Sequence, residues 1–218
     1  MNKPSRSLEW LVWGGLALVI AIIMLAYWRG QLKLGGLLSK PLPVNGPVAD
    51  FTLTNQNSRA ISLADLRGHV WVADIIFTRC TGPCLKMTRQ MKELERALPA
   101  SSQARLVTLT TDPVFDNPAV LKRYAERSDA DPGRWIFLTG TKQQIANLAI
   151  ESLKLTAVEK KPEERESPED LFIHSTLFVL VDKRARLRGI FQTMGEDIDP
   201  QKVKTQILQA VAELERER

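Results

Sequence analysis

Residues 10–28 form a stretch of nineteen residues without a single charged side chain. A helix of this length rises about 28 Å at about 1.5 Å per residue, close to the ~30 Å hydrocarbon thickness of a bilayer. Tryptophan and tyrosine lie toward both ends of the stretch, where amphipathic rings favour the headgroup level. The pattern therefore predicts an N-terminal transmembrane helix that anchors the rest of the chain.

A cleaved secretory signal is the alternative interpretation of this stretch. The apolar core of such a signal is about 7 to 15 residues long and is followed by small residues. The present run is longer and ends in Ala26-Tyr27-Trp28-Arg29, which favours an uncleaved single-pass anchor. Basic residues flank it on both sides, so charge alone does not fix the orientation. A short tail, residues 1–9, before a long domain fits a cytoplasmic tail and a domain exported across the inner membrane, to the periplasm or an equivalent compartment.

The net charge of +5 comes from 30 Lys and Arg against 25 Asp and Glu, and most of it lies near the N-terminus. Residues 1–45 contain five basic residues and one acidic residue, a net +4, which leaves 25 minus 24, or +1, for residues 46–218. A nucleic-acid surface needs clustered basic residues in the folded body. We therefore expect no nucleic-acid partner. Residues 29–46, with a Gly-Gly pair and two prolines, are typical of a tether.

Residues 47–218 alternate between strand and helix patterns. Val70 to Phe77 is an almost continuous apolar run, typical of a strand that is buried on both faces. The segment from Pro83 to Leu98 then follows a helical period. Further strands are expected over 51–53, 60–63, 105–110, 135–138, 176–181 and 187–191, further helices over 117–127, 141–153 and from 199 onward, and a solvated loop over 154–170. This order indicates one α/β domain with a central sheet flanked by helices.

Two cysteines, Cys80 and Cys84, are the only ones in the chain. They follow the buried strand, and Pro83 is a natural first residue of the next helix. The positive end of that helix is expected to favour thiolate over thiol at both positions. Two thiolates four residues apart can bind one soft metal ion or close into a disulfide. The spacing alone does not choose between these two outcomes.

A third metal ligand would have to come from another residue type, and the chain has two histidines, His69 and His174. His69 precedes the buried strand, at the end opposite the cysteines, and is interpreted as an ordinary turn residue. His174 precedes the strand expected over 176–181, so its loop can lie beside the cysteine loop. Two sulfurs and an imidazole suit Cu(I) and also accept Cu(II) or Zn(II).

Three blocks of sequence together resemble the SenC/Sco family over roughly residues 47–215. The first runs Phe-Thr-Arg-Cys-Thr-Gly-Pro-Cys-Leu-Lys-Met from Phe77. The second runs Leu-Thr-Thr-Asp-Pro-Val-Phe-Asp-Asn-Pro from Leu109, and the third runs His-Ser-Thr-Leu-Phe-Val-Leu-Val-Asp from His174, with Arg-Gly following at 188–189.

The resemblance implies a thioredoxin-like domain tethered to a membrane, with Cys80, Cys84 and His174 as copper ligands. Such proteins help to assemble the copper centre of cytochrome c oxidase. The implied function is that of a membrane-anchored copper metallochaperone. Its protein partner would receive copper or electrons and would be a cytochrome c oxidase subunit.

One departure from the family keeps a second function open. The sequence Cys-Thr-Gly-Pro-Cys is closer to the Cys-Gly-Pro-Cys of thioredoxins, and Asp74 resembles the buried thioredoxin aspartate that assists proton transfer. The alternative is a tethered thiol-disulfide oxidoreductase, in which Cys80 attacks a partner disulfide and Cys84 resolves it. The oxidised form would then contain a Cys80–Cys84 disulfide. A redox sensor is a third alternative.

Four other residues near these motifs have ordinary structural interpretations. Met87 and Met91 lie at helical spacing and are interpreted as core residues. Asp112 and Asp116 flank prolines and are expected to serve in turns and caps.

Overall fold

The computed structural model describes residue 10 and residues 13–26, 41–165 and 171–217. The chain divides into two units, Met1–Pro41 and Leu42–Arg218. Residues 13–26 are helical, but in the described part of the chain no helix is long and apolar enough to cross a membrane. The predicted span over 10–28 is therefore not confirmed, and its residues 11–12 and 27–28 lie outside the described residues. The predicted tail, 1–9, and most of the tether, 29–40, also lie outside them.

An eight-stranded sheet forms the centre of the Leu42–Arg218 unit. Its three middle strands β4, β5 and β6 are parallel to one another, and the other neighbouring pairs are antiparallel. The strands occur in the order β1 (Gly46–Pro47), β10 (Arg186–Gln192), β9 (Leu177–Val181), β4 (Trp71–Ile76), β5 (Arg105–Thr110), β6 (Trp135–Thr139), β2 (Thr52–Asn55) and β3 (Ala60–Ser62).

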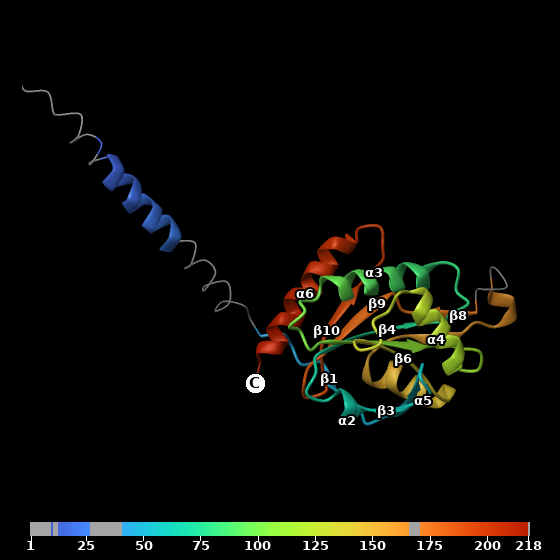
Figure 1. Ribbon diagram of the computed structural model, residues 1–218. Coiled ribbons are helices and arrows are strands. Elements are labelled where there is room, and N and C mark those ends of the chain that lie inside the picture. The colour runs from blue at the N-terminus through green and yellow to red at the C-terminus, as the bar shows by residue number, and fades with distance from the viewer. Residues whose placement is uncertain (1–9, 11–12, 27–40, 166–170, 218) are drawn as a thin grey trace, which may run out of the picture. The chain divides into compact units, whose positions relative to one another are not determined.

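Helices cover both faces of this sheet (Figure 1). The core on one face is shared with α3 (Pro83–Ala97), α4 (Pro118–Arg127) and α6 (Pro200–Arg216). The core on the other face is shared with α2 (Leu63–Leu66), α5 (Lys142–Ala146) and the π-helical turn η1 (Asn147–Ser152) that continues α5. Alternate residues of β4 enter these two cores, which is why its sequence is apolar throughout. The expected thioredoxin-like arrangement is confirmed.

The strand directions bring three distant segments to one edge of the sheet. Because β4 and β5 are parallel, the loops that follow them, residues 77–82 and 111–117, leave the sheet side by side. Strand β9 runs antiparallel to β4, with Val181 paired to Trp71, so β9 begins at the edge where β4 ends. The residues just before β9 therefore lie near the loop formed by residues 77–82, which contains Cys80 and is called the cysteine loop below.

A small two-stranded sheet departs from the sequence expectation of a solvated loop over 154–170. Strand β7 (Ala157–Glu159) pairs antiparallel with β8 (Phe172–His174), and a short 3-10 turn, η2 (Pro162–Glu164), follows β7. The strands are three residues long and pair across more than ten residues of polar sequence. Pairing of this kind depends on tertiary contacts, so local hydrophobic periodicity did not reveal it.

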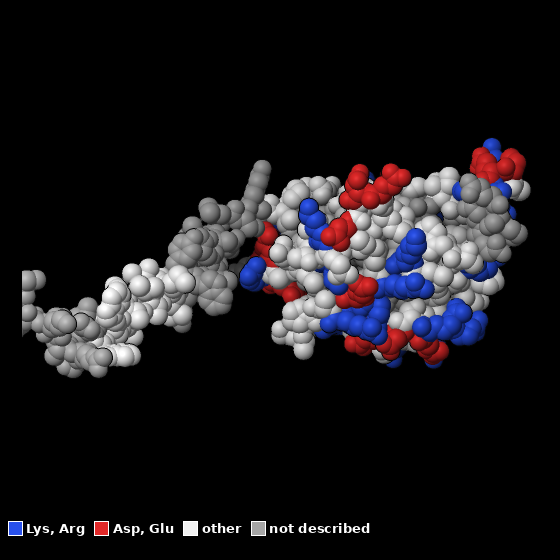
Figure 2. Space-filling model, turned by 90° about the horizontal axis from the view of Figure 1, so that it is seen from above, with Lys and Arg blue, Asp and Glu red and all other residues white. Residues whose placement is uncertain are grey.

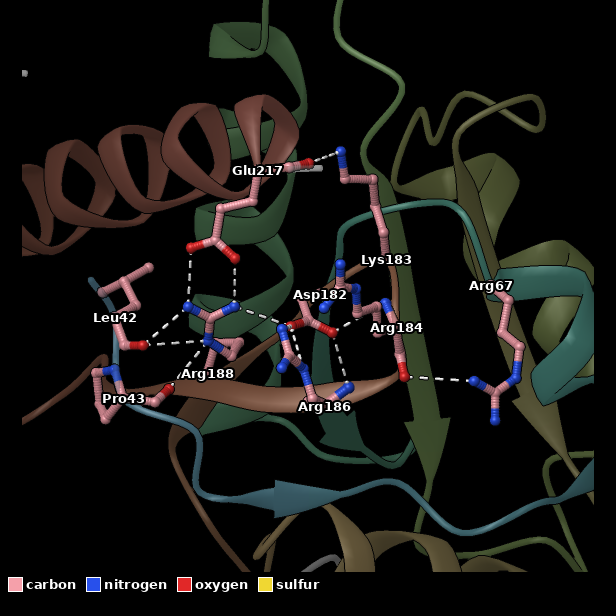
Figure 3. Close-up of polar contacts among 9 residues, drawn as sticks. All are labelled: Leu42, Pro43, Arg67, Asp182, Lys183, Arg184, Arg186, Arg188 and Glu217. Carbon is pink, nitrogen blue, oxygen red and sulfur yellow. Dashed lines mark hydrogen bonds and ion pairs between the residues drawn. The ribbon is translucent and has the colours of Figure 1, made fainter.

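A β-bulge in β10 places Arg188 outside the regular pairing of β10 with β9. The pairing of β10 with β9 shifts between Leu187 and Gly189, which leaves Arg188 as the extra residue. Its guanidinium is almost fully buried and lies among Asp182, Glu217 and two backbone carbonyls (Figure 3). Asp182 begins the turn between β9 and β10, and Glu217 follows the last residue of α6.

The two carbonyl oxygens that accept from Arg188 belong to Leu42 and Pro43 (Figure 3). Both residues lie within the stretch 29–46, which the sequence pattern predicts to be a tether. The structure places them in the compact unit, where the Nη2 of Arg188 donates to Leu42 O at 2.8 Å and its Nε donates to Pro43 O at 3.1 Å. The folded body therefore begins at Leu42.

Candidate functional site

Cys80 and Cys84 lie where β4 gives way to α3. Strand β4 ends at Ile76, the backbone turns so that Cys80 N donates to Phe77 O at 3.2 Å, and α3 begins at Pro83. Both cysteines are present as thiols and not as a disulfide, and both are buried, with Cys80 9% exposed and Cys84 0% exposed. Cys80 is therefore the outer member of the pair, and Cys84 belongs to the core under α3.

The surroundings of Cys84 raise the pKa of its thiol well above the ordinary value. The largest cause is a hydrogen bond with the Cys80 side chain, followed by burial, and the negative charge of Asp74 adds to them. A backbone hydrogen bond at Phe77 acts in the opposite direction but is outweighed. The sequence prediction of a thiolate at this position is therefore wrong, because burial and the neighbouring thiol outweigh the helix end.

Asp74 projects toward the same core as Cys84 and is 1% exposed. Its Oδ1 accepts a hydrogen bond of 2.7 Å from Thr108 Oγ1, on the neighbouring strand β5. Thr108 Oγ1 in turn accepts from Trp135 Nε1 at 2.9 Å, on β6. This hydrogen bond offsets part of the cost of burying a carboxyl group. Sequence reasoning missed Thr108 and Trp135, because their pairing depends on the register of three strands.

Asp116 fixes the cysteine loop from the loop that follows β5. Its carboxylate accepts from Thr78 N at 3.1 Å, from the Thr78 hydroxyl, and from Thr110 Oγ1 at 2.5 Å. Burial raises the pKa of Asp116, although the hydrogen bonds from Thr110 and Thr78 oppose this shift. Asn117, not Asp116, is the N-cap of α4. Asp116 is thus a positioning residue for the cysteine loop, a role that its place beside a proline did not indicate.

Asp112 makes a second connection between the same two loops. Its Oδ2 lies 2.5 Å from Arg79 Nη2, and the Arg79 guanidinium lies over the ring of Phe115, 4.2 Å from its centroid. The cysteine loop is therefore held by two carboxylates from one neighbouring loop.

Met87 and Met91 are fully buried in the core on the α3 face. Their interpretation as core residues is confirmed. His69 lies just before β4, at the end opposite the cysteines, and its Nδ1 is 3.0 Å from Gln103 O. Its interpretation as a turn residue away from the cysteines is also confirmed.

The backbone of His174 ends strand β8, and its side chain lies outside the described residues. The strand itself packs near the cysteine loop, because the rings of Phe172 and Phe77 lie 5.2 Å apart between centroids. Among the side chains that the structure describes, no group of three or more His, Cys, Asp or Glu residues could hold a metal ion. The role of His174 as a third ligand stays a prediction.

The chemistry available at this site is that of two adjacent soft sulfurs with little access to water. Such a pair can bind a soft metal ion such as Cu(I) after losing its protons, or can be oxidised to a disulfide. The two states exclude one another, because a disulfide has no thiolate to donate.

Comparison with known proteins gives consistent results. The SCO1/SenC family profile matches residues 43–212. The SCO1 protein homolog of Bacillus subtilis is 37% identical over 162 residues, which are 72% of this chain and 81% of that protein. A Stutzerimonas stutzeri protein, provisionally named copper-binding, is 30% identical over 169 residues, 77% of this chain and 79% of its own length.

A solved structure extends this similarity to the fold. BsSco, described as a Sco-family cytochrome c oxidase assembly protein with a disulfide switch, is 32% identical and superposes with a TM-score of 0.64. The match covers 79% of this chain and 98% of that one. The family match includes the cysteine loop, Asp116 and the bulged Arg188. On these grounds the chain belongs to the SCO1/SenC family.

Proposed function

We propose that this protein is a membrane-anchored copper-binding chaperone that assists assembly of the copper centre of cytochrome c oxidase. The observation that carries the proposal is the contact between the Cys80 and Cys84 thiols in a largely dry site at the carboxyl end of β4. Family membership and the names of its relatives support the same chemistry.

The proposed ligands are Cys80, Cys84 and His174, and copper is the cargo. Two thiolates and an imidazole suit Cu(I) and also accept Cu(II). Because the pKa of Cys84 is raised, its thiol is protonated at neutral pH, so metal binding must release protons. The loop contacts from Asp116 and Asp112 would hold the Cys80 side of the site in place while copper passes to a partner protein by ligand exchange.

Membrane attachment through residues 10–28, with the domain on the exported side of the inner membrane, is part of the proposal. It is supported by the absence of charge over the stretch and by the large exposed fractions of its described apolar side chains, such as 68% for Trp13 and 66% for Met24. Alkaline carbonate extraction tests it: the full chain should remain with the membrane pellet, and a chain that begins at Leu42 should be released. Release of the full chain would contradict the anchor.

The test of copper binding is an anaerobic Cu(I) titration of the reduced full chain in a non-ionic detergent, against a competing chromophoric ligand. We expect one Cu(I) per chain. Removal of the third ligand by His174→Ala should weaken binding at least about tenfold, the scale seen for changes around metal ligands. His69→Ala is the matched control, because His69 lies at the opposite end of β4. Equal affinities for the two variants would overturn the ligand assignment.

The thiol-disulfide oxidoreductase remains the second candidate, because the two thiols are in hydrogen-bonding contact and Asp74 acts electrostatically on Cys84. The attacking thiol in such enzymes is an exposed cysteine with a lowered pKa. Here Cys80 is 9% exposed, and the pKa of the Cys84 thiol is raised. The unmodified chain and the cysteine-free Cys80→Ser/Cys84→Ser chain are compared for the rate at which each reduces insulin. A faster rate for the unmodified chain, together with weak copper binding, would favour the enzyme.

A further inference from the structure

A groove between α3 and α4 borders the cysteine loop. It consists of two adjoining hollows of about 520 Å³ and 660 Å³, both of which are lined by Thr78 and Arg127. We call these two hollows together the α3–α4 groove. The first is further lined by residues of α3 and α4 that include Leu85, Arg89 and Tyr124, and the second by residues that include Arg79, Phe115 and Arg123.

Basic side chains dominate the rim of this groove. Six of its lining residues are Arg or Lys and two are Glu. Figure 2 shows Lys and Arg side chains gathered in a band on the face that carries α3. Arg79, Lys92 and Arg96 have carboxylate partners. Among the described residues, Arg89, Arg123 and Arg127 have none.

Apolar side chains lie between these charges. Leu85 is 40% exposed and Phe115 is 43% exposed, and both line the groove. Arginine and aromatic residues around a partly apolar hollow are the composition of protein–protein interfaces. The concave shape favours an inserted peptide segment over a flat lipid surface.

Hydrogen bonds join the residues of the groove to the backbone around the two cysteines. Thr88 Oγ1 donates to the Cys84 carbonyl at 2.9 Å and lies 2.7 Å from Tyr124 Oη. Thr78 lines both hollows and lies two residues before Cys80. Its backbone N–H donates a hydrogen bond to the carboxylate of Asp116. A segment bound in the groove would therefore lie against the loop that carries Cys80 and the first turn of α3, which carries Cys84.

We propose that the α3–α4 groove docks an acidic segment of the protein that exchanges copper with Cys80 and Cys84. The carboxylates of the segment pair with Arg89, Arg123 and Arg127, and its apolar residues cover Leu85 and Phe115. The proposal rests on the proposed function for the identity of the cargo. The docking itself depends only on the charge and shape of the groove.

The test uses the full chain in a non-ionic detergent and two synthetic peptides. One is a fluorescein-labelled twelve-residue repeat of Glu-Leu-Asp-Gly, and the other is the neutral repeat Gln-Leu-Asn-Gly. Fluorescence anisotropy should detect binding of the acidic peptide only, weakening as salt rises from about 20 to 300 mM because the charges are exposed. Arg89→Glu/Arg127→Glu should weaken it about tenfold or more, because like charges then face one another.

The matched control is Arg59→Glu/Lys202→Glu, which changes the net charge by the same amount at exposed positions outside the groove. It should bind the acidic peptide within about twofold of the unmodified chain. The milder Arg89→Gln/Arg127→Gln gives an intermediate loss and covers the case in which charge reversal disturbs folding. Equal binding by groove and control variants, or no binding of the acidic peptide at low salt, overturns the proposal.

Two further measurements separate the possible failures. Glycerol phosphate, the headgroup of an anionic lipid, should not bind in the groove; binding of it, but not of the peptide, would assign the surface to lipid and overturn the proposal. Cu(I) titration of the groove variant should match the unmodified chain. Loss of peptide docking with normal copper binding supports the inference, whereas normal docking in a chain that binds no copper refutes the proposed function alone.

Discussion

The guanidinium of Arg188 pairs with the carboxylate of Glu217 through two parallel contacts, Nη1 to Oε2 at 2.7 Å and Nη2 to Oε1 at 2.9 Å. Such fork geometry is the strongest form of an arginine–carboxylate pair. The same guanidinium also reaches Asp182 and the backbone of Leu42 (Figure 3). One side chain therefore ties together the first residues of the domain, the β9–β10 turn and the end of α6.

Replacement of Arg188 by Leu should lower the free energy of unfolding by roughly 3 kcal/mol, because it leaves the buried Asp182 and two carbonyls without this donor. Urea unfolding at pH 7 measures the change. The matched control is Arg186→Gln, since the Arg186 side chain is 32% exposed and its pair with Asp182 should contribute under about 1 kcal/mol. Equal losses of unfolding free energy in the two variants would show that the buried contacts of Arg188 do not stabilise the domain.

The same network predicts an acid-sensitive component of stability. The hydrogen bond from Arg188 lowers the pKa of Glu217. Burial acts to raise the pKa of Asp182, but hydrogen bonds from Arg186 and Arg188 outweigh it, so this pKa is also lowered. Both carboxyl groups hold protons less tightly in the folded state than in the unfolded one. Their contribution is complete above the unfolded pKa values of about 4 to 4.5 and is lost as the pH falls through the lower folded values.

Unfolding free energies measured between pH 7 and pH 3 should therefore fall more steeply below about pH 4.5 in the unmodified chain than in Arg188→Leu. The difference between the two chains should shrink as the carboxyl groups are protonated. A constant difference across this range would show that the charges of Glu217 and Asp182 are not its source.

The position of Leu42 predicts where the independent domain begins. A chain that starts at Leu42 keeps the carbonyls that accept from Arg188, whereas one that starts at Gly46 retains β1 but loses them. The longer chain should be more stable by about 1 to 3 kcal/mol, the value of hydrogen bonds to a buried charged group. Thermal and urea unfolding of the two chains, side by side, checks this.

The Thr108 hydroxyl is predicted to be a stability determinant beneath the site. Thr108→Val removes the donor to Asp74 and the acceptor for Trp135 Nε1, both of them buried. The cost should be about 2 to 4 kcal/mol, because two polar groups each lose a partner. Thr205→Val, at an exposed position on α6, is the control and should change stability by less than about 0.5 kcal/mol. A mild effect at Thr108 would argue against the hydrogen-bond chain.

Asp116 is predicted to control access to Cys80. Asp116→Asn weakens the contacts with Thr78, so the cysteine loop should open more often and Cys80 should be alkylated several-fold faster by iodoacetamide at fixed pH. Site-resolved mass spectrometry measures the rate at Cys80 relative to Cys84. Asp197→Asn, an exposed aspartate before α6, is the control and should leave both rates unchanged.

Local patterns in the sequence predicted much of the architecture. The apolar run ending at Phe77 became β4, and the Pro83 signal marked the first residue of α3. These features are local, because burial on both faces and the start of a helix each leave a short-range pattern. Strands β7 and β8 left no such pattern, because each depends on a partner strand elsewhere in the chain.

The sequence by itself determined that this chain has one dithiol at a strand-to-helix junction, an uncharged stretch near its N-terminus and the motifs of its family. Only the tertiary structure decided how that dithiol is held: Cys84 is a buried thiol and not a thiolate, Asp116 fixes the loop, and Arg188 closes the domain on Leu42. Burial, and hydrogen bonds between residues far apart in sequence, set these properties. Both exist only after the strands have adopted their register, so no local segment could specify them.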